Sequence, residues 1–130
     1  MTSDIEISKP SLPYRKRILF VDDDPLILRS LSSVFHRDRK RWEMVFVVGG
    51  EAGLAELRRT AFDILVTDMF MPGLDGISLL AAAKLHSPAT VRIMLTGSLV
   101  DHRKIDAYAV VPKPWNEASL RDLLERVGNR

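Results

Sequence analysis

The sequence of 130 residues contains no cysteine. Disulfide bonds and thiolate metal sites are therefore excluded, and the fold has to form without covalent cross-links. No apolar run is long enough to cross a membrane. The polar first residues, Met1 to Glu6, lack the basic and apolar regions of a secretory signal peptide. These absences predict a cytoplasmic protein that is not associated with a membrane.

Neither sign of charge dominates the chain. It has 19 Lys and Arg against 17 Asp and Glu, a formal net charge of +2. Such a balance offers no electrostatic argument for binding nucleic acid directly. Hydrophobic residues make up 46 % of the chain and charged residues 28 %, which is usual for a globular domain with a sizeable core. The composition therefore predicts a single compact domain.

Several apolar runs of strand type end at polar residues. In open parallel α/β sheets, the ligand site lies at the carboxyl ends of the strands. These polar side chains are therefore expected to meet at one edge of a sheet. The runs and the residues that end them are 17–21 with Asp22 and Asp23, 64–67 with Asp68, 91–95 with Thr96, and 108–111 with Lys113.

Carboxylates crowded on one edge repel each other, by roughly 4 kcal/mol per pair at 4 Å in an effective dielectric near 20. A hard divalent cation with oxygen ligands, most simply Mg²⁺, offsets that repulsion, and Lys113 adds a further positive charge. A nucleophilic carboxylate, a metal, a hydroxyl and an ammonium together suit phosphoryl transfer to an aspartate.

Strand-type and helix-type segments alternate along most of the chain, and this predicts a parallel sheet with right-handed crossovers and helices on both faces. Residues 1–16 contain prolines and serines without periodicity, so we expect a mobile N-terminal arm before a domain at 17–130. Asp24 and Asn116 are predicted helix caps. Strands are expected at 17–21, 43–48, 64–68, 91–95 and 108–111, and helices at 25–36, 50–59, 76–86 and 116–127.

These motifs resemble the receiver domain of bacterial two-component response regulators. The resemblance implies a flavodoxin-like, doubly wound, five-stranded parallel sheet of order 2-1-3-4-5, and a cis peptide bond between Lys113 and Pro114. It extends from about residue 17 to 127 and rests on Ile18–Pro25, Asp68, Met71–Gly73, Asp75–Gly76, Met94–Gly97 and Lys113–Trp115.

The resemblance implies that Asp68 is the phosphoacceptor. It assigns Asp22 and Asp23 as the acidic pair that binds Mg²⁺, together with Asp68 and the backbone carbonyl of Phe70. The phosphoryl group would come from a sensor histidine kinase or a phosphotransfer protein. Such a domain catalyses its own phosphorylation and slow dephosphorylation, and it is a signalling switch rather than an enzyme.

The resemblance further implies that the Thr96 hydroxyl senses the phosphoryl group and that Lys113 is its ion partner. Hydrolases of the haloacid dehalogenase type also use a strand-end aspartate with Mg²⁺. They need a second carboxylate two residues later, where this chain has Phe70, so the hydrolase alternative is weak.

The segment between Thr96 and Lys113 departs from the family pattern. The two residues are seventeen positions apart, at least one helical turn less than the usual receiver spacing, so a shortened fourth helix is expected within 99–105. The family's aromatic switch position, three before the lysine, is Val110, and Tyr108 is a candidate replacement on the same strand face. An alternative function is therefore a constitutive protein-interaction module that keeps the fold but does not switch.

The output of the domain is open at this stage. Trp42-Glu-Met after a basic run, and Lys113-Pro-Trp, are similar to receivers joined to cyclic-di-nucleotide phosphodiesterase or HD-type domains. No effector domain follows Val127, which suggests either a stand-alone receiver or a piece of a longer regulator. The sequence does not indicate an oligomeric state.

Overall fold

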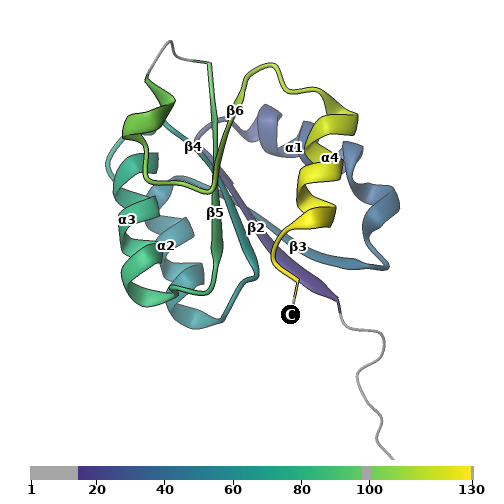
Figure 1. Cartoon of the computed structure of the whole chain (residues 1–130), viewed down its shortest axis with the longest axis horizontal. Coiled ribbons are helices and arrows are strands. Elements are labelled where there is room, and N and C mark those ends of the chain that lie inside the picture. Colours follow the sequence, from purple (N-terminus) through teal and green to yellow (C-terminus); the bar gives the residue numbers. More distant parts are fainter. Residues whose placement is uncertain (1–14, 98–100, 130) are drawn as a thin grey trace, which may run out of the picture.

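The computed structural model describes residues 15–97 and 101–129 (Figure 1). The predicted N-terminal arm therefore lies outside the described residues, except for Arg15 and Lys16. Every predicted strand and helix is present close to its expected ends. The elements are β2 (Lys16–Asp22), α1 (Pro25–Val34), β3 (Trp42–Val48), α2 (Gly50–Arg59), β4 (Ile64–Asp68), α3 (Gly76–His86), β5 (Val91–Thr96), β6 (Ala109–Pro112) and α4 (Glu117–Arg126), with 3₁₀ helices η1 (His36–Asp38) and η2 (His102–Lys104).

The strands form one parallel sheet in the order β3-β2-β4-β5-β6. In chain order this is 2-1-3-4-5, so the predicted flavodoxin-like topology is confirmed. Helices α1 and α4 cover one face, and α2 and α3 cover the other (Figure 1). The register brings the carboxyl ends of the strands to a common edge, with Val21 paired to Thr67, and Asp68 to Leu95.

The central strands are buried on both faces, which explains why they appear in the sequence as continuous apolar runs. Side chains of β2 alternate between two clusters. Ile18 and Phe20 pack with α1 and α4, whereas Leu19 and Val21 pack with α2 and α3. None of the described helices has the length and hydropathy needed to cross a bilayer.

Side-chain caps start three helices at the carboxyl edge of the sheet. Asp24 and Asn116 accept hydrogen bonds from backbone N–H groups of α1 and α4, so both predicted caps are confirmed. Asp75 caps α3 in the same way. These caps satisfy backbone donors that the first turn of a helix leaves without partners.

The shortened fourth helix expected between Thr96 and Lys113 corresponds to one 3₁₀ turn, η2, in the described residues, and it is distinct from α4. Within the described residues between Thr96 and Lys113, η2 is the only helical segment; residues 98–100 lie outside them. Ile105 follows η2 and is buried in the cluster beneath α2 and α3. The chain then returns to the sheet, and Asp106 accepts hydrogen bonds from Lys84 on α3 and Arg92 on β5.

The two candidate switch positions differ in burial. Val110 packs against the cluster beneath α2 and α3. Tyr108 precedes β6 and is 60 % exposed, although its N–H donates to the Arg92 carbonyl at 2.7 Å. A switching role for Tyr108 remains a prediction.

Buried charged groups that the sequence did not indicate join α4 to the rest of the fold. The Lys16 ammonium donates to the Leu124 and Glu125 carbonyls at 2.6 and 3.0 Å, at the end of α4, where a cation also offsets the helix dipole. The guanidinium of Arg121 donates through Nε and Nη2 to Oδ2 of Asp38 at 3.1 and 3.0 Å.

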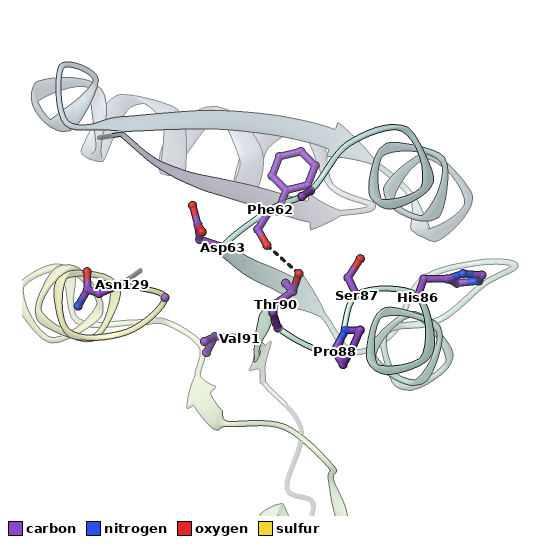
Figure 2. A pocket seen from close by; sticks show the side chains of 11 residues that line it. Phe62, Asp63, His86, Ser87, Pro88, Thr90, Val91 and Asn129 are labelled. Atoms are coloured by element: carbon purple, nitrogen blue, oxygen red, sulfur yellow. Dashed lines mark hydrogen bonds between the residues drawn. The ribbon is translucent and has the colours of Figure 1, made fainter. Parts of the chain in front are cut away.

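A cavity of about 670 Å³ lies beside the amino end of β4, opposite the end that carries Asp68, and Figure 2 shows the side chains that line it. Thr90 and Asp63 line it. The Thr90 hydroxyl donates to the Phe62 carbonyl at 2.7 Å, and the Asp63 carboxylate accepts from the Arg17 N–H at 2.8 Å. These polar groups therefore serve to join chain segments at this end of the sheet.

We expect Asp38→Asn to lower the free energy of unfolding by about 3 kcal/mol at neutral pH, because it leaves the buried Arg121 incompletely paired. Burial alone raises the pKa of the Asp38 carboxyl, but hydrogen bonds from Arg121 and Arg41 outweigh it and hold that pKa below its ordinary value. The stabilisation is then complete above the unfolded-state pKa, near 3.9, and is lost as the pH falls through the folded-state value. Urea unfolding at neutral and acidic pH measures the difference between variant and parent.

The matched control is Asp122→Asn, which breaks an exposed pair with Arg126 on α4 and is expected to cost less than about 1 kcal/mol. Equal losses for Asp38→Asn and Asp122→Asn at neutral pH would contradict this account of the buried pair.

Candidate functional site

Three carboxylates meet at the carboxyl edge of the sheet. Asp22 ends β2 and Asp23 follows it, and Asp68 ends β4, the neighbouring strand. One carboxylate oxygen from each residue lies within 4.8 Å of the others. This is where the strand order reverses, the usual ligand position in open α/β sheets.

Lys113 bridges two of these carboxylates. Its Nζ lies 2.9 Å from Oδ1 of Asp68 and 3.1 Å from Oδ2 of Asp22. The residue directly follows β6, its N–H donates to the Thr96 carbonyl at 2.9 Å, and its peptide bond to Pro114 is cis, as predicted. The structure thus brings together side chains from three strands that are distant in the chain.

The protein supplies little positive charge to this cluster. Burial raises the pKa of Asp22, whose side chain is 2 % exposed, and the nearby Asp68 adds to the rise; hydrogen bonds from the Asp24 N–H and Lys113 only partly offset it. For Lys113, burial lowers the pKa, but hydrogen bonds to Asp68 and Asp22 outweigh burial and raise it. The ammonium therefore stays charged, and among the described residues it is the cation that contacts Asp22 and Asp68.

Thr96 ends β5 at the same edge and is buried. Its hydroxyl lies 3.6 Å from the sulfur of Met69, the residue after Asp68, and its carbonyl accepts from the Lys113 N–H. The predicted sensing hydroxyl thus lies beside the first residue of the loop that follows the predicted phosphoacceptor.

Phe70 belongs to the loop between β4 and α3, and its side chain is 61 % exposed. A glycine at position 76 is required by the close approach of this loop: a Cβ there would lie 2.0 Å from the Asp68 carbonyl oxygen. The Gly76 N–H also donates to the Met69 carbonyl at 2.8 Å. The start of α3 therefore holds the start of the loop.

A cleft of about 360 Å³ opens beside the carboxylates, lined by Asp23, Phe70, Met71, Pro72, Gly73 and Asp75. Asp23 is exposed, whereas Asp22 is buried. The donor set consists of carboxylate oxygens with one side open to solvent, which fits a hard divalent cation that keeps some of its waters, such as Mg²⁺.

A second groove, of about 540 Å³, lies between α1 and the segment after β6. Ile27 and Val34 line it from α1, and Lys113, Pro114 and Trp115 line it from the opposite side. The Trp115 side chain packs against the α1–α4 cluster and also forms a wall of this groove.

One polar contact near the site was missed by sequence reasoning. Glu51, in the first turn of α2, accepts a hydrogen bond through Oε2 from the Leu74 N–H at 3.0 Å. The only sequence signal is an acidic residue directly after the Gly49-Gly50 pair. That signal says nothing of a loop 23 residues further on.

The family model of the response regulator receiver domain matches residues 18–125 of this sequence. The chain belongs to this family. Among curated relatives, it is 36 % identical over 111 residues to the transcriptional activator protein PfeR of Pseudomonas aeruginosa, covering 80 % of this chain and 35 % of PfeR. It is 32 % identical over 113 residues to the response regulator receiver protein Anae109_2439 of Anaeromyxobacter sp., covering 83 % of this chain and 47 % of that protein. This receiver domain thus spans less than half the length of either relative.

Solved structures show the same fold. The signal receiver domain of an HD domain-containing protein from Pseudomonas fluorescens Pf-5 superposes with a TM-score of 0.80 at 26 % identity, covering 88 % of this chain and 94 % of that one. The BeF3-activated DrrB receiver domain gives a TM-score of 0.76 at 26 % identity, covering 87 % and 97 %. The chain is therefore a response regulator receiver of the two-component type, with its acidic cluster at the expected edge.

Asp22→Asn is expected to raise the free energy of unfolding at neutral pH by about 1 kcal/mol, or the melting temperature by about 4 °C. The amide keeps the size of the side chain and an acceptor for the Asp24 N–H, but it removes one of the mutually repelling charges. Thermal unfolding in the absence of divalent cations measures the gain.

Asp24→Asn serves as the control, because it also removes a carboxylate while an asparagine still caps α1. A melting temperature for Asp22→Asn at or below that of the parent would mean that the contact with Lys113 outweighs the repulsion.

Proposed function

We propose that this receiver accepts a phosphoryl group on Asp68 from a phosphohistidine of a sensor histidine kinase or phosphotransfer protein in the cytoplasm, in a Mg²⁺-dependent reaction. Phosphorylation then changes which partners the domain binds. The observation that carries the proposal is the bridge from Lys113 to Asp68 and Asp22 beside the open cleft. It provides a strand-end nucleophile, an anion-binding ammonium and access from solvent.

In the transfer step, a carboxylate oxygen of Asp68 attacks the phosphorus. The new O–P bond forms as the P–N bond to the donor histidine breaks, and its electron pair returns to the imidazole nitrogen. Asp22, Asp23, Asp68 and the Phe70 carbonyl would hold Mg²⁺, which when bound neutralises negative charge on the carboxylates and on the phosphoryl group. The partial burial of Asp68, whose side chain is 12 % exposed, limits competition from water.

Lys113 and Thr96 respond to the new group. The ammonium, already 2.9 Å from Asp68, binds a phosphoryl oxygen, and the Thr96 hydroxyl donates to another. Because the Lys113 N–H donates a hydrogen bond to the Thr96 carbonyl, a movement of either residue shifts the ends of both β5 and β6. The shift of these strand ends favours one of two conformations of the domain surface. Slow dephosphorylation then restores the resting conformation.

The donor protein would dock beside the site, in the groove formed by α1 and Trp115. This groove has an apolar lining, and Lys113 forms part of its wall. Leu26, at the start of α1, is 65 % exposed. A helix that carries a phosphohistidine could bury apolar side chains here while its imidazole reaches the cleft.

A constitutive interaction module is the second candidate. Two features favour it. In the described residues between β5 and β6, the only helical segment is the 3₁₀ helix η2, and an aliphatic residue, Val110, occupies the family's aromatic position. Such a module would bind its partners equally well with and without a phosphoryl mimic on Asp68.

The phosphorylation test uses Mg²⁺ with beryllium fluoride, a phosphoryl mimic. The parent is expected to be stabilised by about 1.4 kcal/mol when the free ligand is at ten times its Kd, and acetyl phosphate is expected to add one phosphoryl group by mass spectrometry. Asp68→Asn removes the nucleophile and should abolish both effects. Asp24→Asn should retain them.

Phosphoryl addition at the parent rate on Asp68→Asn would show that the acceptor lies elsewhere. A parent that shows no adduct and no stabilisation would favour the constitutive module.

Phe70→Asn is expected to shorten the lifetime of phosphorylated Asp68 about tenfold, a barrier change on the order of 1 to 2 kcal/mol. Phe70 lines the cleft and offers no group to align a water for in-line attack, whereas an amide does. Ser98, two residues after Thr96, lies outside the described residues. Decay of the labelled protein after removal of the donor gives the rate.

Phe70→Leu is the matched apolar control and should decay as slowly as the parent. Equal decay of the asparagine and leucine variants would assign the control of water to the backbone or to the short segment after β5.

A further inference from the structure

The loop 69–75, which follows Asp68, lies against the amino end of α2. At Gly50 a Cβ would lie 1.9 Å from the carbonyl oxygen of Leu74. Only a glycine therefore allows the first turn of α2 to approach so closely. Gly73 has a φ of +75°, which turns the loop toward this helix.

The Glu51 carboxylate closes this contact. Its Oε2 accepts the Leu74 N–H at 3.0 Å, and a Cβ at Gly73 would lie 2.5 Å from the same oxygen. The carboxylate thus lies directly against the peptide unit between Gly73 and Leu74. A hydrogen bond to an ionised acceptor is about twice as strong as one between neutral groups.

The same loop forms one side of the candidate metal site. It carries the Phe70 carbonyl and, with Asp23, lines the cleft. Its first residue is held by the N–H of Gly76, its last part by Glu51, and between them Met71 is buried in the core. The position of the Phe70 carbonyl therefore depends on how both ends are held.

The start of α2 is also joined to the other half of the ligand set. The N–H of Gly49 donates to the main-chain oxygen of Asp22 at 3.0 Å. The segment from Gly49 to Glu51 thus connects the end of β2 with the loop after β4. These two places carry Asp22, Asp23 and the Phe70 carbonyl, and the remaining predicted ligand, Asp68, directly precedes the loop.

We propose that Glu51 is a positioning residue for this metal site: its hydrogen bond to Leu74 sets the loop so that the Phe70 carbonyl faces Asp23 and Asp68. The inference rests on the proposed Mg²⁺-dependent function and adds a residue outside the predicted ligand set. Because coupling is reciprocal, metal binding must also strengthen the contact between Glu51 and Leu74.

The experiment compares Mg²⁺ binding by calorimetry in the parent, Glu51→Ala and Glu51→Gln. The alanine variant removes the acceptor and is expected to raise the Kd for Mg²⁺ about tenfold, the usual effect of losing a group that orients a metal ligand. The glutamine variant keeps an acceptor oxygen and should stay within about threefold of the parent. Calorimetry measures the folded protein, so a loss of stability alone does not change this Kd.

Glu56→Ala is the charge-matched control, since Glu56 lies on the same helix and pairs with Arg59. It should leave the Kd unchanged. Amide hydrogen exchange at Leu74 provides a second readout: exchange should be faster in Glu51→Ala, and Mg²⁺ should slow it in the parent but not in that variant.

Two results would overturn the positioning role while leaving the function intact. One is an unchanged Kd in Glu51→Ala, and the other is an equal rise in Glu51→Ala, Glu51→Gln and Glu56→Ala, which would assign the effect to net charge. A parent that binds no Mg²⁺ would instead refute the metal-dependent function, and the positioning role with it.

Discussion

Electrostatic repulsion among Asp22, Asp23 and Asp68 is the constraint on which the rest of the site depends. Three carboxylates with oxygens within 4.8 Å of one another face one ammonium, from Lys113. Such an arrangement costs stability unless a cation or a phosphoryl-bound metal completes it, so the folded domain is prepared to bind charge. In the proposed reaction, the same imbalance favours the binding of a metal cation.

The remaining parts of the fold keep the three carboxylates and Lys113 close together. The parallel register puts the ends of β2 and β4 side by side, and the two apolar clusters bury both faces of these strands. Lys16 attaches the end of α4 to the start of β2, and the Asp38–Arg121 pair attaches α4 to η1. Glycines at positions 50 and 76 let backbone segments meet closely beside the site. Strand pairing and packing on both faces thus oppose separation of the carboxylates.

The site and the output side of the domain follow the family to different degrees. The carboxylates and Lys113 meet as the resemblance implied, although their roles remain proposals. In the described residues between β5 and β6, the only helical segment is η2, after which Ile105 is buried in the core and Asp106 pairs with Lys84 on α3 and Arg92 on β5. A phosphorylation signal passing through Thr96 and Lys113 would therefore reach a surface unlike that of a receiver with a full fourth helix.

The sequence alone determined the elements, their order and the residues that end each strand, because apolar periodicity, caps such as Asp24 and the Pro-Gly loop are local signals. It could therefore indicate that Asp68 and Lys113 share an edge. Only the tertiary structure decided that Lys113 contacts Asp22 as well, that Arg121 reaches Asp38, and that Glu51 holds the loop after β4. Those contacts join residues from 23 to 91 positions apart, and their geometry depends on helix placement and side-chain packing that no local pattern encodes.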